Sequence, residues 1–284
     1  MLTVIESINL SEKYLREKGI NEPRINAEIM LAEILRCKRL DLYLRFDRPL
    51  KEEERNKYRE FLARRGNHEP LQYILNKTEF YGLEFYVDEN VLIPRPDTEI
   101  LVEEIIERFS KSESEIKILE VGTGSGNIAV ALAKNISAAE ITAVDVSKEA
   151  LKIAERNAET NGIKNIIFKA VDIFDEEIMK SGEKYDVIVS NPPYIPKDNL
   201  ETSEKEVKDY EPLNALSDGK NGLSFYERIC ETGKEKLNEN GMIFFEIEKD
   251  ADEKVKTIME KKGYKKIETK KDYSGITRII WGSK

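Results

Sequence analysis

The sequence predicts an α/β protein with a seven-stranded, mostly parallel Rossmann-like sheet, preceded by a small N-terminal helical bundle and a β-hairpin linker. Three observations predict this fold. Residues 1–75 show apolar side chains at helical spacing, residues 76–96 mix aromatic and β-branched residues around turn signals, and residues 97–284 alternate strand and helix patterns. Such alternation is typical of a parallel sheet. We therefore expect a helical domain at 1–75, a hairpin linker at 76–96 and a sheet domain at 97–284.

The helical domain carries start and stop signals for three helices. Thr3 and Glu6 have the spacing of a capping box at the start of the first helix. Pro23 begins a second helix, and the highly charged third helix, "KEEERNKYREFLARR", stops at Gly66. These signals predict a helical bundle.

The linker and the helix after it are marked by a change of pattern. The stretch "TEFYGLEFYVDENVLIP" places aromatic and β-branched residues around Gly82 and the turn residues 88–90, as hairpin strands do. The next stretch, "PRPDTEILVEEIIERF", returns to helical spacing, and we expect Asp97 or Thr98 to be its N-cap.

Seven strand candidates follow, separated by helical stretches. They are Ile116–Val121, Glu140–Val146, Asn165–Val171, Tyr185–Ser190, Gly241–Glu248, "YKKIETKKD" and "TRIIWGS". The last two lie close together in the sequence, so we expect them to pair antiparallel. The predicted sheet thus has six parallel strands and a reversed last strand.

Composition limits the class of protein. The chain has 46 basic and 55 acidic residues, a net charge of −9, whereas a general nucleic-acid coat would be basic. Residues 1–75 carry 15 basic and 13 acidic residues, a net charge of +2, which leaves −11 for the rest. Cys37 and Cys230 lie far apart and His68 is the single histidine, so no disulfide framework or metal site is expected. We expect a cytoplasmic monomer with no membrane partner.

A glycine-rich turn in "ILEVGTGSGNIAVALA" predicts a ligand site between the first strand and its helix. Glycines let the backbone pass close to a ligand, and the helix N-terminus offers unpaired N–H groups. A P-loop lysine is absent, and Asn127 stands where a dinucleotide fingerprint has glycine. Glu120 adds negative charge at the expected mouth of the site, which favours a cationic ligand. The residues expected to hold the cofactor here are Glu120, Gly122, Thr123, Gly124, Ser125 and Gly126.

Two aspartates lie at the ends of the second and third predicted strands. Asp145 lies 23 residues beyond Gly122, where a carboxylate can accept both hydroxyls of a ribose. A helix N-cap is the alternative role, although Ser147 can also fill it. Asp172 is in the equivalent place on the third strand and could accept from an adenine amino group, with Ile173 or Phe174 covering the ring. Ribose, adenine and a positive centre together describe S-adenosylmethionine.

The fourth predicted strand ends in "VIVSNPPYIP", which places a rigid polar turn beside the glycine loop. Amide and aromatic-amine nitrogens are poor nucleophiles because their lone pair is delocalised. The Asn191 side-chain oxygen and the Pro192 carbonyl can accept both hydrogens of an NH₂ group and hold its nitrogen toward a methyl donor. We expect Pro193 to stiffen this turn and Tyr194 to stack on a planar acceptor. A rigid turn without a ligand is the alternative.

The wider sequence resembles the HemK-type family of peptide-chain release factor methyltransferases. The similar stretches are "EPLQYILNKTEFYGLEFYVDENVLIPRPDTEILVE", "SNPPYIP", "YEPLNAL", "DGKNGLSFYERI" and "KDYSGITRII", so the resemblance covers essentially the whole chain. It implies a class I methyltransferase sheet and transfer of a methyl group to the N5 amide nitrogen of the glutamine in the Gly-Gly-Gln motif of release factors. It also implies that Arg95 helps to shape the site. Residues 248–251, after "FFEI", depart from the family pattern.

Two alternatives remain open from the sequence. A nucleic-acid amino methyltransferase would use the same NPPY chemistry, and the basic cluster Arg36, Lys38, Arg39, Arg45 and Arg48 is the feature that favours it. The net charge of −11 in the rest of the chain speaks against stable nucleic-acid binding. A non-catalytic S-adenosylmethionine-binding module is the other alternative, although it has no need for an amide clamp. We expect residues 1–75 to dock the release factor.

Overall fold

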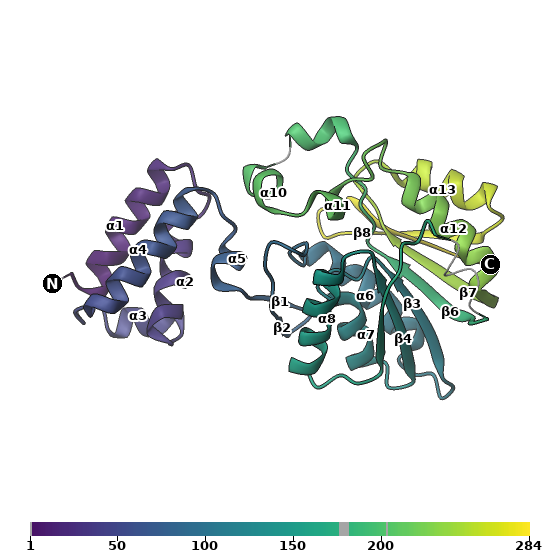
Figure 1. The fold of residues 1–284 in the computed structure, drawn as a ribbon, viewed down its shortest axis with the longest axis horizontal. Coiled ribbons are helices and arrows are strands. Elements are labelled where there is room, and N and C mark those ends of the chain that lie inside the picture. The colour runs from purple at the N-terminus through teal and green to yellow at the C-terminus, as the bar shows by residue number, and fades with distance from the viewer. Residues whose placement is uncertain (1, 176–181, 203) are drawn as a thin grey trace. The chain divides into compact units, whose positions relative to one another are not determined.

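The computed structural model describes residues 2–175, 182–202 and 204–284 (Figure 1). Contacts divide the chain into two compact units. The smaller consists of Met1–Asn76 together with Glu204–Tyr210, and the larger of Lys77–Ser203 together with Glu211–Lys284. The hairpin expected to be a separate linker therefore belongs to the larger unit, and residues 204–210 join the helical unit. Within the described ranges, no helix is both long and apolar enough to cross a membrane.

The smaller unit is a helical bundle. Its elements are α1 (Val4–Glu17), α2 (Pro23–Leu35), α3 (Arg39–Leu44), α4 (Glu52–Gly66), α5 (Leu71–Leu75) and α10 (Lys205–Tyr210). The predicted capping box forms: the Glu6 N–H donates to Thr3 Oγ1, and the Thr3 N–H donates to Glu6 Oε2 at 2.9 Å. The sequence did not predict α3 and α5, because helices of six and five residues are too short to show a repeat.

Residues 204–210 join this unit through polar contacts to α4 and the turn after it. Arg65 Nη2 contacts Glu206 Oε1 at 2.6 Å, and the Tyr210 hydroxyl donates to the Asn67 carbonyl at 2.9 Å. Arg65 is 4% exposed and also donates to Asn26 Oδ1 at 2.7 Å. A buried guanidinium needs such partners, so Glu206 supplies charge that the helical bundle itself requires.

The larger unit contains a hairpin and a seven-stranded sheet. Its strands are β1 (Thr78–Phe80), β2 (Leu83–Phe85), β3 (Ile116–Val121), β4 (Ala139–Asp145), β5 (Ile166–Ala170), β6 (Tyr185–Ser190), β7 (Leu237–Glu246), β8 (Lys265–Lys271) and β9 (Thr277–Ser283). The sheet order is β5-β4-β3-β6-β7-β9-β8, and β9 pairs antiparallel with both of its neighbours. The predicted fold is thereby confirmed: six strands run parallel and the last is reversed.

Helices cover both faces of this sheet (Figure 1). They are α6 (Pro96–Phe109), α7 (Asn127–Asn135), α8 (Lys148–Thr160), α12 (Ser224–Lys236) and α13 (Asp252–Lys261), with η1 (Lys197–Thr202) and α11 (Leu213–Leu216) as short segments between β6 and α12. Side chains alternate across each strand. Val187 and Val189 pack in the core under α6 and α7, whereas Ile188 packs in the core under α12 and α13. The strands are therefore apolar on both faces, as parallel strands are.

The start of α6 differs from the prediction. Arg95 is the N-cap and Pro96 the first helical residue, so neither Asp97 nor Thr98 caps the helix. Proline at this position is favoured because its φ is already helical and its missing N–H is not needed. The Thr98 hydroxyl is turned instead toward the sheet, where it donates to Glu246 Oε2 at 2.6 Å.

Candidate active site

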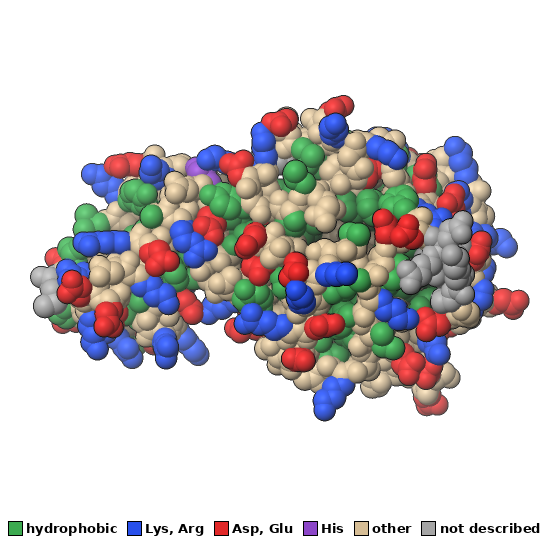
Figure 2. Space-filling model, viewed as in Figure 1, with side chains coloured by type: hydrophobic (Ala, Val, Ile, Leu, Met, Phe, Trp, Pro, Cys, Tyr) green, Lys and Arg blue, Asp and Glu red, His purple; other side chains and the backbone are tan. Residues whose placement is uncertain are grey.

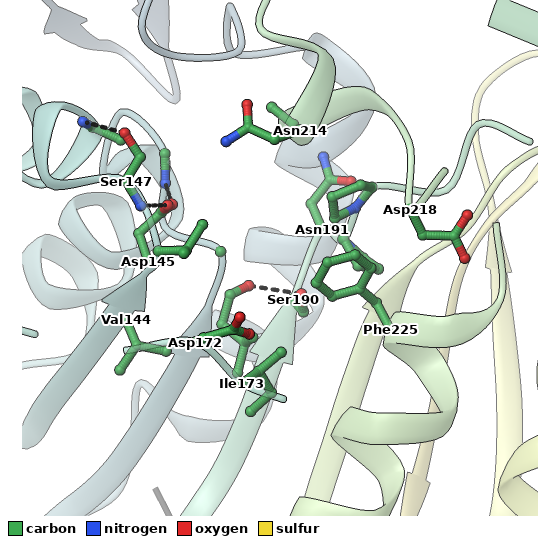
Figure 3. A pocket seen from close by; sticks show the side chains of 18 of the residues that line it. Val144, Asp145, Ser147, Asp172, Ile173, Ser190, Asn191, Asn214, Asp218 and Phe225 are labelled. Carbon is green, nitrogen blue, oxygen red and sulfur yellow. Dashed lines mark hydrogen bonds between the residues drawn. The ribbon is translucent and has the colours of Figure 1, made fainter. Parts of the chain in front are cut away.

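A cavity of about 400 Å³ lies at the carboxyl ends of the central strands (Figure 3). Strand β3 pairs with β4 on one side and with β6 on the other, so the order in which strands are added to the sheet reverses beside β3. Ligands of parallel α/β sheets bind at such a switch point. The lining residues used below are Gly122, Gly124, Asp145, Asp172, Ile173, Asn191, Pro192, Pro193, Asn214, Asp218 and Phe225.

The glycine loop forms one wall of the cavity. Gly122 and Gly124 have φ of +76° and +54°, and a Cβ added at either would meet no atom within 4 Å. Their positive φ requires glycine, and the open space in front of them is where a ligand can approach the backbone. Gly126 has another role, since a Cβ there would lie 3.0 Å from the Ala154 Cβ and push α7 away from α8.

Asp145 ends β4 and faces the cavity with a carboxylate already held by the backbone. Its Oδ2 accepts from the Gly124 N–H at 2.9 Å, and its Oδ1 accepts from the Ser147 N–H at 2.9 Å. Ser147, not Asp145, is the N-cap of α8 and accepts from the Ala150 N–H at 3.1 Å. Burial raises the pKa of Asp145 despite these hydrogen bonds. The carboxylate is therefore fixed in place. Because Ser147 caps α8, the Asp145 carboxylate remains available to a ligand.

Asp172 and Ile173 line the cavity beyond the end of β5. Asp172 Oδ1 accepts from the Phe174 N–H at 2.9 Å, which folds a tight turn. Arg228 of α12 holds that turn from behind by donating to the Ile173 carbonyl at 2.6 Å. The rings of Phe174 and Phe225 meet edge to face with centroids 5.1 Å apart. The structure thus brings the two predicted adenine-binding residues to the cavity, with an aromatic pair beside them.

The NPPY turn ends β6 next to the glycine loop. The Ser190 hydroxyl donates to the Val121 carbonyl at 2.7 Å, which ties the end of β6 to the end of β3. Asn191 Nδ2 donates to Thr98 Oγ1 at 3.2 Å. No hydrogen bond to Asn191 Oδ1 is present within the described part of the chain. The amide oxygen is therefore the atom that Asn191 can offer to a ligand.

Six predicted site residues do not line the cavity: Glu120, Thr123, Ser125, Gly126, Tyr194 and Arg95. Glu120 is fully buried, and Thr123 Oγ1 donates to its carboxyl at 2.7 Å. The structure therefore does not place the Glu120 charge at the mouth of the site, as expected from the sequence. Burial and the nearby Asp145 raise the pKa of Glu120 to about 8, so it is mostly neutral at pH 7.

Tyr194 and Arg95 make contacts behind the cavity wall. The Tyr194 hydroxyl donates to Glu246 Oε1 at 3.3 Å, and Tyr194 is not among the residues that line the cavity. Arg95 Nη2 contacts Glu211 Oε1 at 2.5 Å and thereby holds the start of the segment that leads to Asn214. Stacking of Tyr194 on a substrate stays a prediction.

Sequence reasoning missed the segment that forms the outer wall, residues 213–222. It pairs with the chain after NPPY: the Ile195 N–H donates to the Leu216 carbonyl at 2.9 Å, and the Lys197 N–H donates to the Lys220 carbonyl at 3.0 Å. Asn214 and Asp218 line the cavity from this segment, and the Asp218 carboxylate accepts from the N–H groups of its own loop, including that of Gly222 at 3.0 Å (Figure 3). Only the sequence resemblance of "YEPLNAL" and "DGKNGL" marked the segment, since irregular structure has no periodic pattern.

The buried Glu120 leads to a prediction about pH and stability. Its pKa is about 8 in the folded chain but near 4.5 in the unfolded chain, so folding retains a proton between these pH values. The contribution of Glu120 to stability is therefore largest below pH 4.5 and is lost as pH rises through 8. We expect urea unfolding to show wild type losing roughly 1–3 kcal/mol relative to Glu120→Gln between pH 5 and 8.5. Parallel stability curves for the two proteins would show that Glu120 is ionised in the folded chain.

The fold and this site define a methyltransferase of the Rossmann-like class. A methyltransferase-domain family matches residues 112–273, and the family described as the PrmC N-terminal domain matches residues 6–75. A methyltransferase from Pyrococcus furiosus shares the fold, with a TM-score of 0.53 and 20% identity over 72% of this chain and 90% of its own.

Relatives similar over nearly the whole chain narrow this class to one family. A release factor glutamine methyltransferase from Fusobacterium nucleatum is 40% identical over 281 residues, 99% of this chain and 78% of the relative. Another, from Geobacter sulfurreducens, is 40% identical over 280 residues, 99% of this chain and 96% of the relative. The chain belongs to the release factor glutamine methyltransferase family, which confirms the resemblance seen in the sequence.

Proposed function

We propose that this protein transfers a methyl group from S-adenosylmethionine to the side-chain amide nitrogen (N5) of the glutamine in the Gly-Gly-Gln motif of peptide-chain release factors. The observation that carries the proposal is the position of NPPY. Asn191, Pro192 and Pro193 line the same cavity as the glycine loop and Asp145. They directly follow β6, which is hydrogen-bonded to β3, the strand before that loop. A methyl donor and an amide acceptor can therefore share one cavity.

The cavity residues fit S-adenosylmethionine. A volume of about 400 Å³ lies within the range of small-molecule sites. Asp145 would hold the ribose hydroxyls, Asp172 and Ile173 would hold adenine, and the open backbone at Gly122 and Gly124 would face the methionine portion. When bound, the cofactor supplies an electrophilic methyl group on a sulfonium.

The acceptor amide would be held by the NPPY turn. Asn191 Oδ1 and the Pro192 carbonyl accept its two N–H groups, which orients the nitrogen without removing a proton in advance. The prolines fix these acceptors, so little reorganisation is needed when the reaction occurs. Both prolines also exclude water from the wall, because Pro192 is buried and Pro193 half-buried.

A methyl-transfer assay tests this function. Radiolabelled S-adenosylmethionine is offered with a release factor, with its Gln→Ala variant in the Gly-Gly-Gln motif, or with total nucleic acid. We expect label only in the intact factor. Label in nucleic acid would favour the alternative of a nucleic-acid base methyltransferase, which the basic cluster indicates. Cofactor binding without methyl transfer would favour the alternative of a non-catalytic binding module.

Asp145 provides a test of the cofactor site. Asp145→Ala removes the expected ribose acceptor, and a hydrogen bond to a charged group contributes about 1.5–3 kcal/mol. We expect calorimetry to show S-adenosylmethionine binding weakened by about 1–3 kcal/mol. Exposed Glu140→Gln on the same strand is the control, with wild-type affinity expected. Unchanged affinity in Asp145→Ala would remove this residue from the site.

The helical unit is proposed to dock the release factor. It exposes large apolar side chains on α3 and the turn after it: Leu40 is 77%, Leu44 80% and Phe46 54% exposed. Basic side chains gather at the edge of the unit where α3 lies (Figure 2). Apolar residues ringed by charge are typical of an interaction surface.

We expect the double variant Leu40→Ser/Leu44→Ser to raise KM for an intact release factor by about 5- to 30-fold, the effect of losing one or two important contacts. The rate on a short Gly-Gly-Gln peptide should not change, because such a peptide lacks the rest of the release factor, which is the part proposed to contact this surface. Tyr273→Ser, at a site 98% exposed in the larger unit, is the matched control. An unchanged KM for the intact factor would refute docking through α3.

A further inference from the structure

A chain of buried polar groups lies directly behind the NPPY turn. Asn191 Nδ2 donates to Thr98 Oγ1 at 3.2 Å, and Thr98 Oγ1 donates to Glu246 Oε2 at 2.6 Å. The second carboxyl oxygen of Glu246 accepts from the Tyr194 hydroxyl at 3.3 Å. Thr98 is 1% and Glu246 2% exposed, and neither lines the cavity. These groups come from α6, β7 and the end of β6, so the fold brings them together over long sequence separations.

We infer that Thr98 and Glu246 are positioning residues that determine which end of the Asn191 carboxamide faces the cavity. The inference deepens the proposed function, on which its catalytic consequence rests. A carboxamide can flip by 180° at little cost unless its neighbours distinguish its oxygen from its nitrogen. Only the orientation with Oδ1 in the cavity can accept a hydrogen from the substrate amide. The flipped amide would present N–H groups to the N–H groups of the substrate.

We call the hydrogen bonds from Asn191 to Thr98 and from Thr98 to Glu246 the relay. The donors and acceptors in the relay explain how it selects one orientation of the Asn191 carboxamide. An ionised carboxylate is an acceptor only, so Thr98 must donate its single hydrogen to Glu246. The Thr98 oxygen then has lone pairs to offer, and only the NH₂ end of Asn191 can donate to them. The charge on Glu246 thus fixes the direction of two successive hydrogen bonds. A protonated Glu246 can donate to Thr98, which frees the threonine hydrogen for a flipped Asn191.

The groups around Glu246 hold its pKa near neutral pH, so that both of its protonation states are populated there. Burial raises the pKa of Glu246 to about 7, with the hydrogen bonds from Thr98 and Tyr194 opposing that rise. Asp97 of α6 raises the pKa further and Arg278 of β9 lowers it. Arg278 is itself shared with acidic partners, at 3.2 Å from Asp97 Oδ2 and 3.0 Å from Asp272 Oδ2. From α12, the Tyr226 hydroxyl donates to the backbone carbonyl of residue 246. The relay therefore tightens as pH rises through neutrality.

The first experiment removes the hydroxyl of Thr98 while keeping its shape. We expect Thr98→Val to lower the single-turnover rate at saturating release factor by about 10- to 100-fold, the scale of small misplacements in an active site. Cofactor affinity should stay within about threefold of wild type, because the hydroxyl does not reach the cavity. Thr98→Ser keeps the hydroxyl and should recover most of the rate.

Thr232→Val is the matched control. Its hydroxyl is equally buried, but its oxygen has no hydrogen-bond partner within the described part of the chain. We expect wild-type turnover from this variant. Thermal unfolding of each variant checks that the chain is folded, so that a lost rate cannot be confused with a lost structure.

A double-mutant cycle separates positioning from general support of the fold. If Thr98 acts only through Asn191, then adding Thr98→Val to Asn191→Ala should change the residual rate by less than about twofold. An effect in that background as large as in wild type would overturn the relay. We also expect the wild-type rate to rise as pH rises through 7, because ionised Glu246 fixes the relay. In Glu246→Gln this rise should be absent, because the side chain at 246 no longer titrates. A persistent rise in that variant would also count against it.

An NMR readout tests the relay without the substrate. The side-chain NH₂ signal of Asn191 is identified by its loss in Asn191→Ala. We expect one of its two protons to exchange with water at least about tenfold faster in Thr98→Val than in wild type, since a hydrogen bond protects it. Equal exchange would refute the relay even if release factors prove not to be substrates. Faster exchange with no methylation of any release factor would instead refute the proposed function alone.

Discussion

Asn191→Ala is expected to lower single-turnover methyl transfer by about 10²–10³, the effect of removing one preorganised polar partner of a transition state. The substitution removes the acceptor oxygen but leaves the glycine loop and Asp145 in place. The lost interaction matters most when the nitrogen lone pair turns toward the methyl group, so it acts on the transition state more than on binding. Cofactor affinity should therefore change by less than about tenfold.

Asn191→Asp is the informative comparison, because it is nearly isosteric. Its carboxylate can accept from a substrate amide but cannot donate to Thr98, and its charge would attract the sulfonium. We expect it to be about as poor as the alanine variant. The measurement is single-turnover transfer at saturating release factor, with a parallel cofactor titration. Near-wild-type turnover in Asn191→Ala would mean that NPPY is only a rigid turn, and the amide mechanism would have to be abandoned.

Gly222→Ala is expected to cause the largest loss of stability among the glycine sites near the cavity. Gly222 has a φ of +78°, and a Cβ there would lie 2.1 Å from the Tyr194 carbonyl oxygen. Backbone cannot yield as a flexible side chain does, so the outer segment would separate from the NPPY turn. Left-handed strain and overpacking together should lower the free energy of unfolding by about 2–5 kcal/mol. Turnover should fall at least about tenfold, since the NPPY backbone shifts.

Gly219→Ala is the matched control for this effect. Gly219 lies in the same segment with a nearly equal φ of +71°, but an added Cβ would meet no atom within 4 Å. Only the left-handed strain applies, so we expect a loss of about 1–2 kcal/mol and little change in turnover. Urea unfolding and single-turnover rates compare the two variants. Equal losses of stability and turnover in the two variants would show that the close contact with Tyr194 is not the reason for glycine at position 222.

The sequence predicted the sheet and much of the cavity because both depend on local signals. Strand β3 begins and ends as expected, the glycine loop directly follows it, and Asp145 ends β4. The relay behind Asn191 could not be predicted. Thr98 and Glu246 are 148 residues apart, and their contact depends on how α6 crosses the end of β7. The prediction that Glu120 lies at the mouth of the site was wrong for a related reason, because the sequence does not show which side chains at the end of a strand are buried.

The two-segment construction of the helical unit limits how this protein can be recombined. Arg65 and Glu206 lie 141 positions apart in the chain, yet they form one ion pair whose guanidinium is buried. A chimaera that took only residues 1–76 from a relative would combine the helices of that relative with α10 of this protein. Its buried guanidinium could then lack a carboxylate. Domain exchange in this protein therefore needs two simultaneous grafts, and evolutionary change at Arg65 is expected to be accompanied by change at Glu206.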